Sequence, residues 1–324
     1  MTGTIETVRG RIAAEQLGTT LMHEHLLIRN QELEANMALP ERSMDGWVAL
    51  AVDGLHALQQ RGIRALVDLT VIGLGRDIHP IIRINELVPD FNIVVATGYY
   101  TFNDLPSFFH NHGPGRMIDG PDPLHQMFVR DITEGISGTR VKAAIIKIAA
   151  DEPGFTPDVL RVWEQAARAH KDTGAPITTH SNAAKKGGLE QQEVLRKHGI
   201  DLTRTVIGHC GDSSDLDYLQ RLMDAGSYLG MDRFGLTWFA KDEDRIAVVA
   251  ELCRRGYAER LTLSHDAGYY SVNSEPSYRD KALPQWKHTL LSDVIIPRLR
   301  EEGVTDAQLH QMLNVNPVRI LAAQ

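Results

Sequence analysis

The segment TLMHEHLLI, residues 20–28, places two histidines two positions apart within an otherwise apolar run. Successive side chains of an extended strand point to opposite faces, so His23 and His25 would share one face if this segment is a strand. An isolated H-x-H pair is more often two hydrogen-bonded core histidines than a metal site, since histidine is often partly buried. The rest of the chain has to decide between these interpretations.

Seven further apolar segments of β-type composition follow, and stretches with helical periodicity alternate with them. The eight predicted strands cover 20–28, 65–72, 92–100, 143–151, 176–181, 205–211, 227–235 and 261–268. Predicted helices cover 46–62, 215–226, 242–256 and a segment with Thr156 as N-cap and Pro157 at its first position. Alternating strands and helices indicate parallel pairing, and eight such units in roughly 300 residues predict an α/β fold, a (β/α)8 TIM barrel.

Both ends of the chain predict additions to this barrel. Residues 1–19 alternate and then turn, which predicts a short N-terminal β appendage. The patterns of 292–303 and 305–322 predict extra C-terminal helices over the outside or one end of the barrel. The polar, irregular segment 267–286 is long enough to form a lid. No linker divides the chain, so we expect one domain over 1–324.

Composition limits the possible function classes. Of the 324 residues, 43% are hydrophobic and 23% are charged, as in ordinary soluble globular proteins. The formal charge of −8 offers no basic face to nucleic acid, and no apolar run approaches the ~20 residues that span a bilayer. The N-terminus lacks the apolar core of a signal peptide, and Cys210 and Cys253 cannot form a disulfide framework. We therefore expect a cytoplasmic protein with two inert buried thiols and with neither nucleic acid nor a membrane as partner.

Six side chains with metal-binding or nucleophilic chemistry lie at the carboxyl ends of predicted strands. They are His23 and His25 on the first, Lys147 on the fourth, His180 on the fifth, His209 on the sixth and Asp266 on the eighth. The loops at this end of a TIM barrel build the active site, so we expect the six to meet at one mouth. The histidines predicted to be solvated are His56, His79, His125, His170, His198, His288 and His310. A second H-x-H, in HNHGPG at 110–115, has no strand before it and is not expected to bind a metal.

The number of these groups favours two metal ions over one. Four imidazoles and one carboxylate exceed an open tetrahedral zinc site, which uses three protein ligands and a water. Two ions about 3.5–4 Å apart would use them all. An ammonium beside two dications is unfavourable, so Lys147 must be neutral or have become an anion. Carboxylation by CO2 would turn its amine into a carbamate, which can bridge two ions.

Five motifs carry a resemblance to a known family: H-E-H at 23–25, IIKIAADEPG at 145–154, TTHS at 178–181, IGHCGD at 207–212 and SHDAG at 264–268. In this order they resemble the phosphotriesterase family of the amidohydrolase superfamily, and more closely its phosphotriesterase-like lactonases, over nearly the whole chain. The resemblance implies that His23, His25 and Asp266 bind the more buried metal. It further implies that His180 and His209 bind the more exposed metal and that carboxylated Lys147 bridges both. Zinc is the first choice, with cobalt, manganese or iron as alternatives, and a homodimer is implied.

Two further residues resemble features of the lactonases. Tyr100 ends the third strand and Arg233 ends the seventh, where related lactonases line the substrate pocket with a tyrosine and an arginine. The alternative interpretations are a buried tyrosine with a satisfied hydroxyl, and an arginine paired to Asp232 or a nearby carboxylate.

The leading hypothesis for function is a hydrolase in which a hydroxide that bridges the two metals opens a lactone, with Asp266 passing the proton to the leaving alkoxide. The resemblance implies an N-acyl-homoserine lactone, hence a quorum-quenching enzyme, with slow organophosphate hydrolysis as a side activity. The alternatives are a primary phosphotriesterase or another carboxylic-ester hydrolase on the same site. Hypotheses of other classes are a lyase that forms a Schiff base at Lys147 and a catalytically inactive binding protein.

Overall fold

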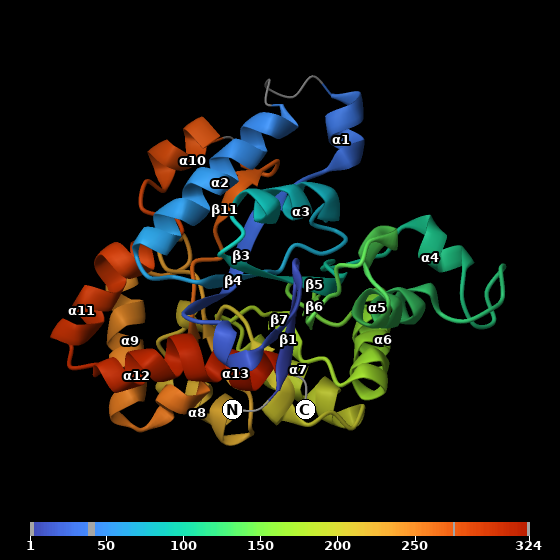
Figure 1. Cartoon of the computed structure of the whole chain (residues 1–324). Helices are drawn as coiled ribbons and strands as arrows, with labels where there is room; N and C mark the ends of the chain where they lie inside the picture. The colour runs from blue at the N-terminus through green and yellow to red at the C-terminus, as the bar shows by residue number, and fades with distance from the viewer. Residues whose placement is uncertain (1–2, 38–42, 275, 323–324) are drawn as a thin grey trace.

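The computed structural model describes residues 3–37, 43–274 and 276–322, and these form the predicted (β/α)8 barrel (Figure 1). The strands lie in the order β10-β9-β8-β7-β6-β5-β4-β3-β11, and all neighbours in this sheet are parallel. The bounds are β3 (Thr20–Ile28), β4 (Ala65–Asp68), β5 (Asn92–Tyr99), β6 (Ile145–Ala149), β7 (Ile177–His180), β8 (Thr205–Ile207), β9 (Tyr228–Met231), β10 (Leu261–Leu263) and β11 (Gly268–Ser271). The eight predicted strands are confirmed, although several are shorter than predicted.

The eighth barrel strand is built from two pieces, β10 and β11. β10 pairs with β9, and β11 pairs with β3 so that Gly268 lies opposite His25. Residues 264–267, which we call the seam, pass from one neighbour to the other. Here the amide of Asp266 donates to the carbonyl of His23 at 3.1 Å, and the amide of His25 donates to the carbonyl of Ala267 at 2.8 Å. The barrel therefore closes beside the H-E-H segment.

Helices surround the barrel. They are α1 (Gln31–Asn36), α2 (Met44–Gln60), α3 (Ile78–Leu87), α4 (Ser107–Asn111), α5 (Pro123–Thr133), α6 (Pro157–Thr173), α7 (Gly187–Lys197), α8 (Leu216–Asp224), α9 (Asp242–Arg254), α10 (Pro276–Ala282), α11 (Ile296–Glu301), α12 (Asp306–His310) and α13 (Asn316–Leu321). Helix α6 begins as predicted, because the Thr156 hydroxyl accepts from the amide of Val159 and Pro157 occupies the first position. It ends where Gly174 adopts φ 74°, a left-handed conformation that favours glycine.

The predicted additions are present at the amino end of the barrel. β1 (Thr4–Thr7) and β2 (Gly10–Ala13) form an antiparallel hairpin, which is the predicted appendage. The hairpin lies beside α13 (Figure 1), and Ile5 shares an apolar cluster with Val318 of that helix. The same cluster includes Val67 and Ile145 of the barrel strands β4 and β6. The β1–β2 hairpin and α13 therefore cover the amino end of the barrel.

Two predictions require correction. Segment 267–286 is not irregular, because it contains β11 and α10, and the eighth strand needs β11 to close the barrel. His288 is not solvated: its side chain is buried, and its ring stacks on Tyr269 with centroids 4.0 Å apart. The other six histidines predicted to be solvated are exposed or half-buried.

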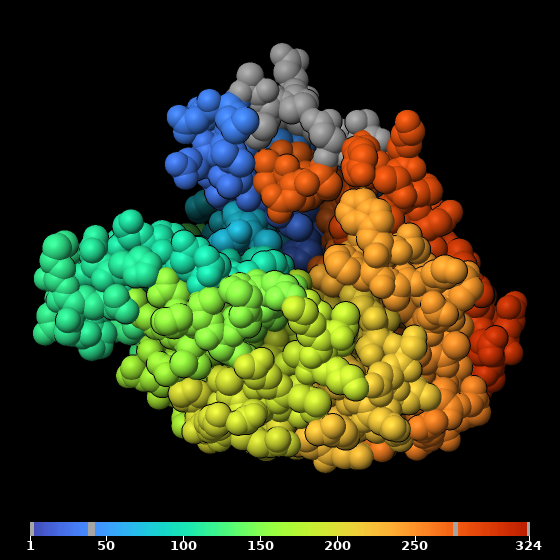
Figure 2. All heavy atoms as spheres, turned by 180° about the vertical axis from the view of Figure 1, so that it is seen from behind, coloured from blue at the N-terminus to red at the C-terminus, as the bar shows by residue number. Residues whose placement is uncertain are grey.

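The segment between β5 and α5, which contains α4, projects from the body of the protein (Figures 1 and 2). His110 and His112 of the second H-x-H lie here, away from the barrel interior, and His112 Nδ1 donates to the carbonyl of Phe108 at 2.8 Å. Both cysteines are buried, as predicted. Within the described residues, no helix has the length and apolar character needed to cross a bilayer.

Candidate metal centre

The structure brings the six predicted ligands together at the carboxyl end of the barrel, and all but Asp266 are buried to within a few per cent. His23 and His25 share one face of β3, Lys147 lies in β6, and His180 ends β7. His209 and Asp266 instead follow strands that have already ended, with φ of 62° and 56°. These two residues reach the site through a left-handed turn and not through strand alternation.

The facing atoms of these side chains lie at short distances. Asp266 Oδ1 is 3.1 Å from His25 Nε2 and 3.4 Å from His23 Nε2. Lys147 Nζ is 3.2 Å from His23 Nε2. Ligand atoms of His23, His209 and Asp266 all lie within 4.8 Å of one another. The ligands predicted for the two metal ions therefore lie in one cluster of donor atoms.

The outer nitrogens of the imidazoles are held by oxygen atoms. Asp232 spans two of them, with Oδ2 at 2.8 Å from His23 Nδ1 and Oδ1 at 2.9 Å from His209 Nδ1. Asp151 Oδ2 is 2.7 Å from His180 Nε2. Carboxylates only accept, so each of these outer nitrogens carries the proton and the inner nitrogen presents a lone pair. The fourth, His25 Nδ1, lies 2.8 Å from the hydroxyl of Thr70.

This arrangement fits a bound cation. His209 Nε2 and His180 Nδ1 face each other at 2.9 Å, and both are acceptors once their outer nitrogens donate to carboxylates. The Tyr100 hydroxyl lies 3.2 Å from His180 Nδ1 and can donate to it, whereas His209 Nε2 has no donor among the residues that the structure describes. Two lone pairs at this distance repel unless positive charge lies between them. The chemistry of the donor set therefore matches divalent metal ions that prefer imidazole and carboxylate.

The local pKa values keep the imidazoles available as ligands. Burial lowers the pKa of His180 to about 4 and that of His209 well below its ordinary value, and burial together with Lys147 lowers the pKa of His23. Burial also lowers the pKa of Lys147 to about 8. A neutral amine is the form that reacts with CO2, so this shift favours the carboxylation implied by the sequence.

Buried neutral histidines predict how the stability of the metal-free protein depends on pH. Burial lowers the pKa of His265 to about 3 and those of His180 and His288 to about 4, so below pH 6.5 the unfolded chain binds protons that the folded chain does not. Burial raises the pKa of Glu24, but the amides of His265 and Ala267 and the His265 ring hold it as the carboxylate at neutral pH. Its protonation between pH 7 and pH 5 acts in the opposite direction for one group. The lowered pKa values of His23 and His209 act in the same direction as those of the other buried histidines, so we expect a net loss of several kcal/mol in the free energy of unfolding between pH 7 and pH 5.

Urea unfolding of chelator-treated protein at several pH values measures this loss. The variant His288→Gln removes one of these histidines, so its profile should be shallower over the same range. A free energy of unfolding that is constant from pH 7 to pH 5 would contradict the assignment of these histidines as buried and neutral.

Arg233 lies against Asp266, at the edge of the six predicted ligands. Its Nε donates to Asp266 Oδ2 at 3.1 Å, and a terminal nitrogen donates to Asp212 at 2.9 Å. The alternative considered from the sequence, an arginine paired to Asp232 or a nearby carboxylate, is met by the pairs with Asp266 and Asp212. The guanidinium also lies 4.5 Å from the ring centroid of Phe239, which is 58% exposed at the mouth. Burial raises the pKa of Asp266, whereas His23, His209 and Arg233 lower it. The net result is a pKa well below the ordinary value.

The site contains residues that the sequence did not single out. Asp232 and Asp151 bond the outer imidazole nitrogens, and Asp212 bonds Arg233. The one available signal was position, because each lies within three residues of a predicted site residue or a predicted strand end. Glu24 and His265, adjacent to predicted ligands, were also missed and are buried.

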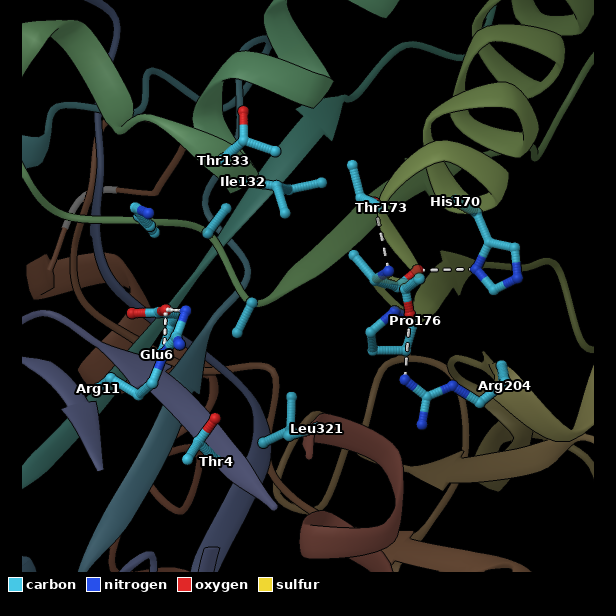
Figure 3. A pocket seen from close by; sticks show the side chains of 15 residues that line it. Thr4, Glu6, Arg11, Ile132, Thr133, His170, Thr173, Pro176, Arg204 and Leu321 are labelled. Carbon is cyan, nitrogen blue, oxygen red and sulfur yellow. Dashed lines mark hydrogen bonds and ion pairs between the residues drawn. The ribbon is translucent and has the colours of Figure 1, made fainter. Parts of the chain in front are cut away.

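A cavity of about 540 Å³ lies at the opposite end of the barrel (Figure 3). None of the six predicted ligands lines it. Several of its polar groups are engaged within the chain: Arg11 pairs with Glu6, Arg204 donates to the carbonyl of Gly174, and His170 Nδ1 donates to the carbonyl of Ala175. In a TIM barrel this end serves stability, and the catalytic groups lie at the other end.

Comparison with known proteins agrees with this geometry. A family model described as "Phosphotriesterase family" matches residues 3–321. The structure of the phosphotriesterase from Mycobacterium tuberculosis is 49% identical, with a TM-score of 0.95 and 98% of each chain covered. An aryldialkylphosphatase of Saccharolobus solfataricus is 37% identical over 96% of this chain and 97% of the relative. A solved protein described as organophosphate hydrolysis activity engineered from a weak promiscuous lactonase template is 30% identical, with a TM-score of 0.86 over 98% of this chain and 100% of the other.

Proposed function

Because this chain belongs to the phosphotriesterase family and is a metal-dependent hydrolase, we propose that it opens lactones at a binuclear centre held by the six predicted ligands. The single observation that carries the proposal is the set of inward-facing imidazole nitrogens, whose outer nitrogens are fixed by Asp232 and Asp151. Metal-binding histidines generally have such outer partners, which fix the tautomer and increase ligand basicity.

The six residues would divide between two ions. His23, His25 and Asp266 would hold the more buried ion, and His180 with His209 the more exposed one. Lys147, as its carbamate, would bridge both from its buried position in β6. When bound, two divalent cations supply Lewis acidity, which lowers the pKa of water toward neutrality and polarises the substrate oxygen. Zinc suits these ligands, with cobalt, manganese or iron as alternatives.

Asp266 would carry the proton during the reaction, and Arg233 would keep the Asp266 carboxylate ionised. The contact with Arg233 keeps the Asp266 carboxylate ionised, so it can accept a proton from the attacking water. It would then release that proton to the departing alkoxide, and the product is a hydroxy acid. The pair between Arg233 and Asp212 holds the guanidinium in place during this transfer.

The substrate proposal is a lactone, with an N-acyl-homoserine lactone as the first choice. Tyr100 supports it, since its hydroxyl lies 3.2 Å from His180 Nδ1 and can donate to a developing oxyanion beside that residue. Burial raises the pKa of Tyr100, so it remains a donor at neutral pH. A relative whose organophosphate hydrolysis activity is described as engineered from a weak promiscuous lactonase template also supports it. The aryldialkylphosphatase supports organophosphate hydrolysis as a second activity.

Activity measurements with and without metal test the proposal. We expect a chelator to abolish hydrolysis and added zinc, cobalt, manganese or iron to restore it. We also expect kcat/KM for at least one member of a lactone panel to exceed that for an aryl phosphotriester. A higher value for the phosphotriester would refute the lactonase assignment but not the metal centre. Full activity after metal removal, with borohydride trapping of substrate on Lys147, would instead support the Schiff-base lyase. The homodimer and the cytoplasmic location stay predictions.

A further inference from the structure

Glu24 lies between the two histidines of H-E-H and points away from the centre. Its side chain is fully buried, with no exposed area. In a strand the side chain between His23 and His25 must point to the opposite face, so Glu24 cannot join them as a ligand. A buried carboxylate needs hydrogen-bond donors, and those of Glu24 come from the seam.

The Glu24 carboxylate contacts the backbone on both sides of Asp266. Its Oε1 accepts from the amide of His265 at 3.0 Å, and its Oε2 accepts from the amide of Ala267 at 3.1 Å. The intervening amide of Asp266 donates to the carbonyl of His23 at 3.1 Å. Three consecutive amides of the seam are thereby tied to two consecutive residues of β3.

These bonds hold Asp266 in an unfavourable backbone conformation. Its φ of 56° lies in the left-handed region, which a non-glycine residue adopts at a cost of roughly 1–2 kcal/mol. The same conformation directs its carboxylate toward His23 Nε2 and His25 Nε2, at 3.4 Å and 3.1 Å. Without the hydrogen bonds on both sides of Asp266, the seam would relax toward extended backbone. The Asp266 carboxylate would then move away from His23 and His25.

Hydrogen bonds of the His265 side chain hold Glu24 in place. His265 Nδ1 donates to Glu24 Oε1 at 2.7 Å, and His265 Nε2 accepts from the amide of Leu291 at 2.9 Å. Leu291 begins a π-helical turn, Leu291–Ile295, ahead of α11. The Glu24 side chain therefore connects β3, the seam and the C-terminal helices.

We propose that Glu24 is a positioning residue: its carboxylate sets the backbone at Asp266 so that this ligand reaches the cation shared with His23 and His25. The inference rests on the proposed function, because it assigns Asp266 to the buried ion. It accounts for the acidic residue at the centre of H-E-H, which metal ligation alone does not require.

The variant Glu24→Gln tests the inference with little change in shape. The amide keeps one acceptor oxygen for the two donors of His265, but its NH2 group then faces the amide of Ala267, where two donors oppose each other. The hydrogen bond from the amide of Ala267 to residue 24 is therefore lost, while the one from the amide of His265 remains. Outer-sphere partners of metal ligands typically contribute 10- to 100-fold in metal affinity, so we expect one of the two ions to bind about 10- to 100-fold more weakly.

Competition with a chelator of known affinity, followed by elemental analysis, measures both ions. The matched control is Asp131→Asn, which alters a similarly buried carboxylate whose partners, Arg76 and Thr97, are not among the six predicted ligands. We expect both variants to lose thermal stability, but only Glu24→Gln to retain one ion where the parent retains two. Saturating metal should restore much of its kcat.

Each outcome bears on a defined claim. If the parent binds two ions and Glu24→Gln binds both with parental affinity, the positioning role is wrong while the proposed function stands. Equal loss of metal in Glu24→Gln and Asp131→Asn would also overturn it, because the effect would then be general destabilisation. A parent chain that binds no metal would overturn the proposed function itself.

Discussion

Replacing Lys147 with methionine is expected to lower kcat/KM for the best lactone by about 10³-fold or more. The buried amine lies 3.2 Å from His23 Nε2 and 3.3 Å from the carbonyl of Thr179, at the centre of the donor set. Methionine matches its length but cannot form the bridging carbamate, so each ion would lose a ligand and the two would no longer be joined. Metal ions contribute several kcal/mol to such reactions, and each 1.4 kcal/mol changes the rate about tenfold.

The matched control is Lys142→Met. Lys142 precedes the same strand but lines the cavity at the opposite end of the barrel, so its loss should leave kcat/KM within about twofold of the parent. Steady-state kinetics and elemental analysis of both variants measure the outcome. Parental activity and two bound ions in Lys147→Met would refute the bridging role.

Replacing Asp266 with asparagine is expected to lower kcat by about 10²- to 10⁴-fold, the range associated with general acid–base catalysis. Asparagine keeps the shape of the side chain but loses its charge, so it ligates a cation weakly and cannot carry the proton. It also leaves the Arg233 guanidinium with Asp212 as its remaining charged partner. With saturating metal, the fall should appear mainly in kcat and not in KM.

Asp122→Asn is the control for this variant, because Asp122 is also buried and also bonds an arginine, Arg161, at 2.8 Å. Its pair lies between α5 and α6, so we expect lower stability with unchanged kcat. The proton-transfer role would be wrong if Asp266→Asn with both ions bound turned over at the parental rate.

The strands and helices of the barrel could be predicted because each depends on local pattern. β3 is buried on both faces, as a parallel strand of a barrel is, and most of its residues are apolar; the Thr156 cap with Pro157 marks the start of α6. The seam could not be predicted. It depends on β10 ending at Leu263 and on β11 pairing with a strand more than 200 residues earlier. The irregular composition of 267–286 therefore suggested a lid where the structure has a strand and a helix.

The six side chains could be singled out as a group because their residue types are unusual at strand ends. Their outer partners could not, since an aspartate after a strand has many ordinary uses. Asp232 is distinguished by contacts with His23 and His209, which barrel closure alone brings to one place. The solvated assignment of His288 failed for the same reason, because its burial depends on packing against Tyr269 and Glu24.

The most direct test of the account is to count and locate metal ions in the purified chain, by elemental analysis together with anomalous diffraction from crystals grown with the same metal. The account predicts two divalent cations per chain: one among His23, His25 and Asp266, one beside His180 and His209, with extra density on Lys147 Nζ between them. A chain that hydrolyses its substrate fully while holding no metal, or that binds its ions away from these six side chains, would contradict it.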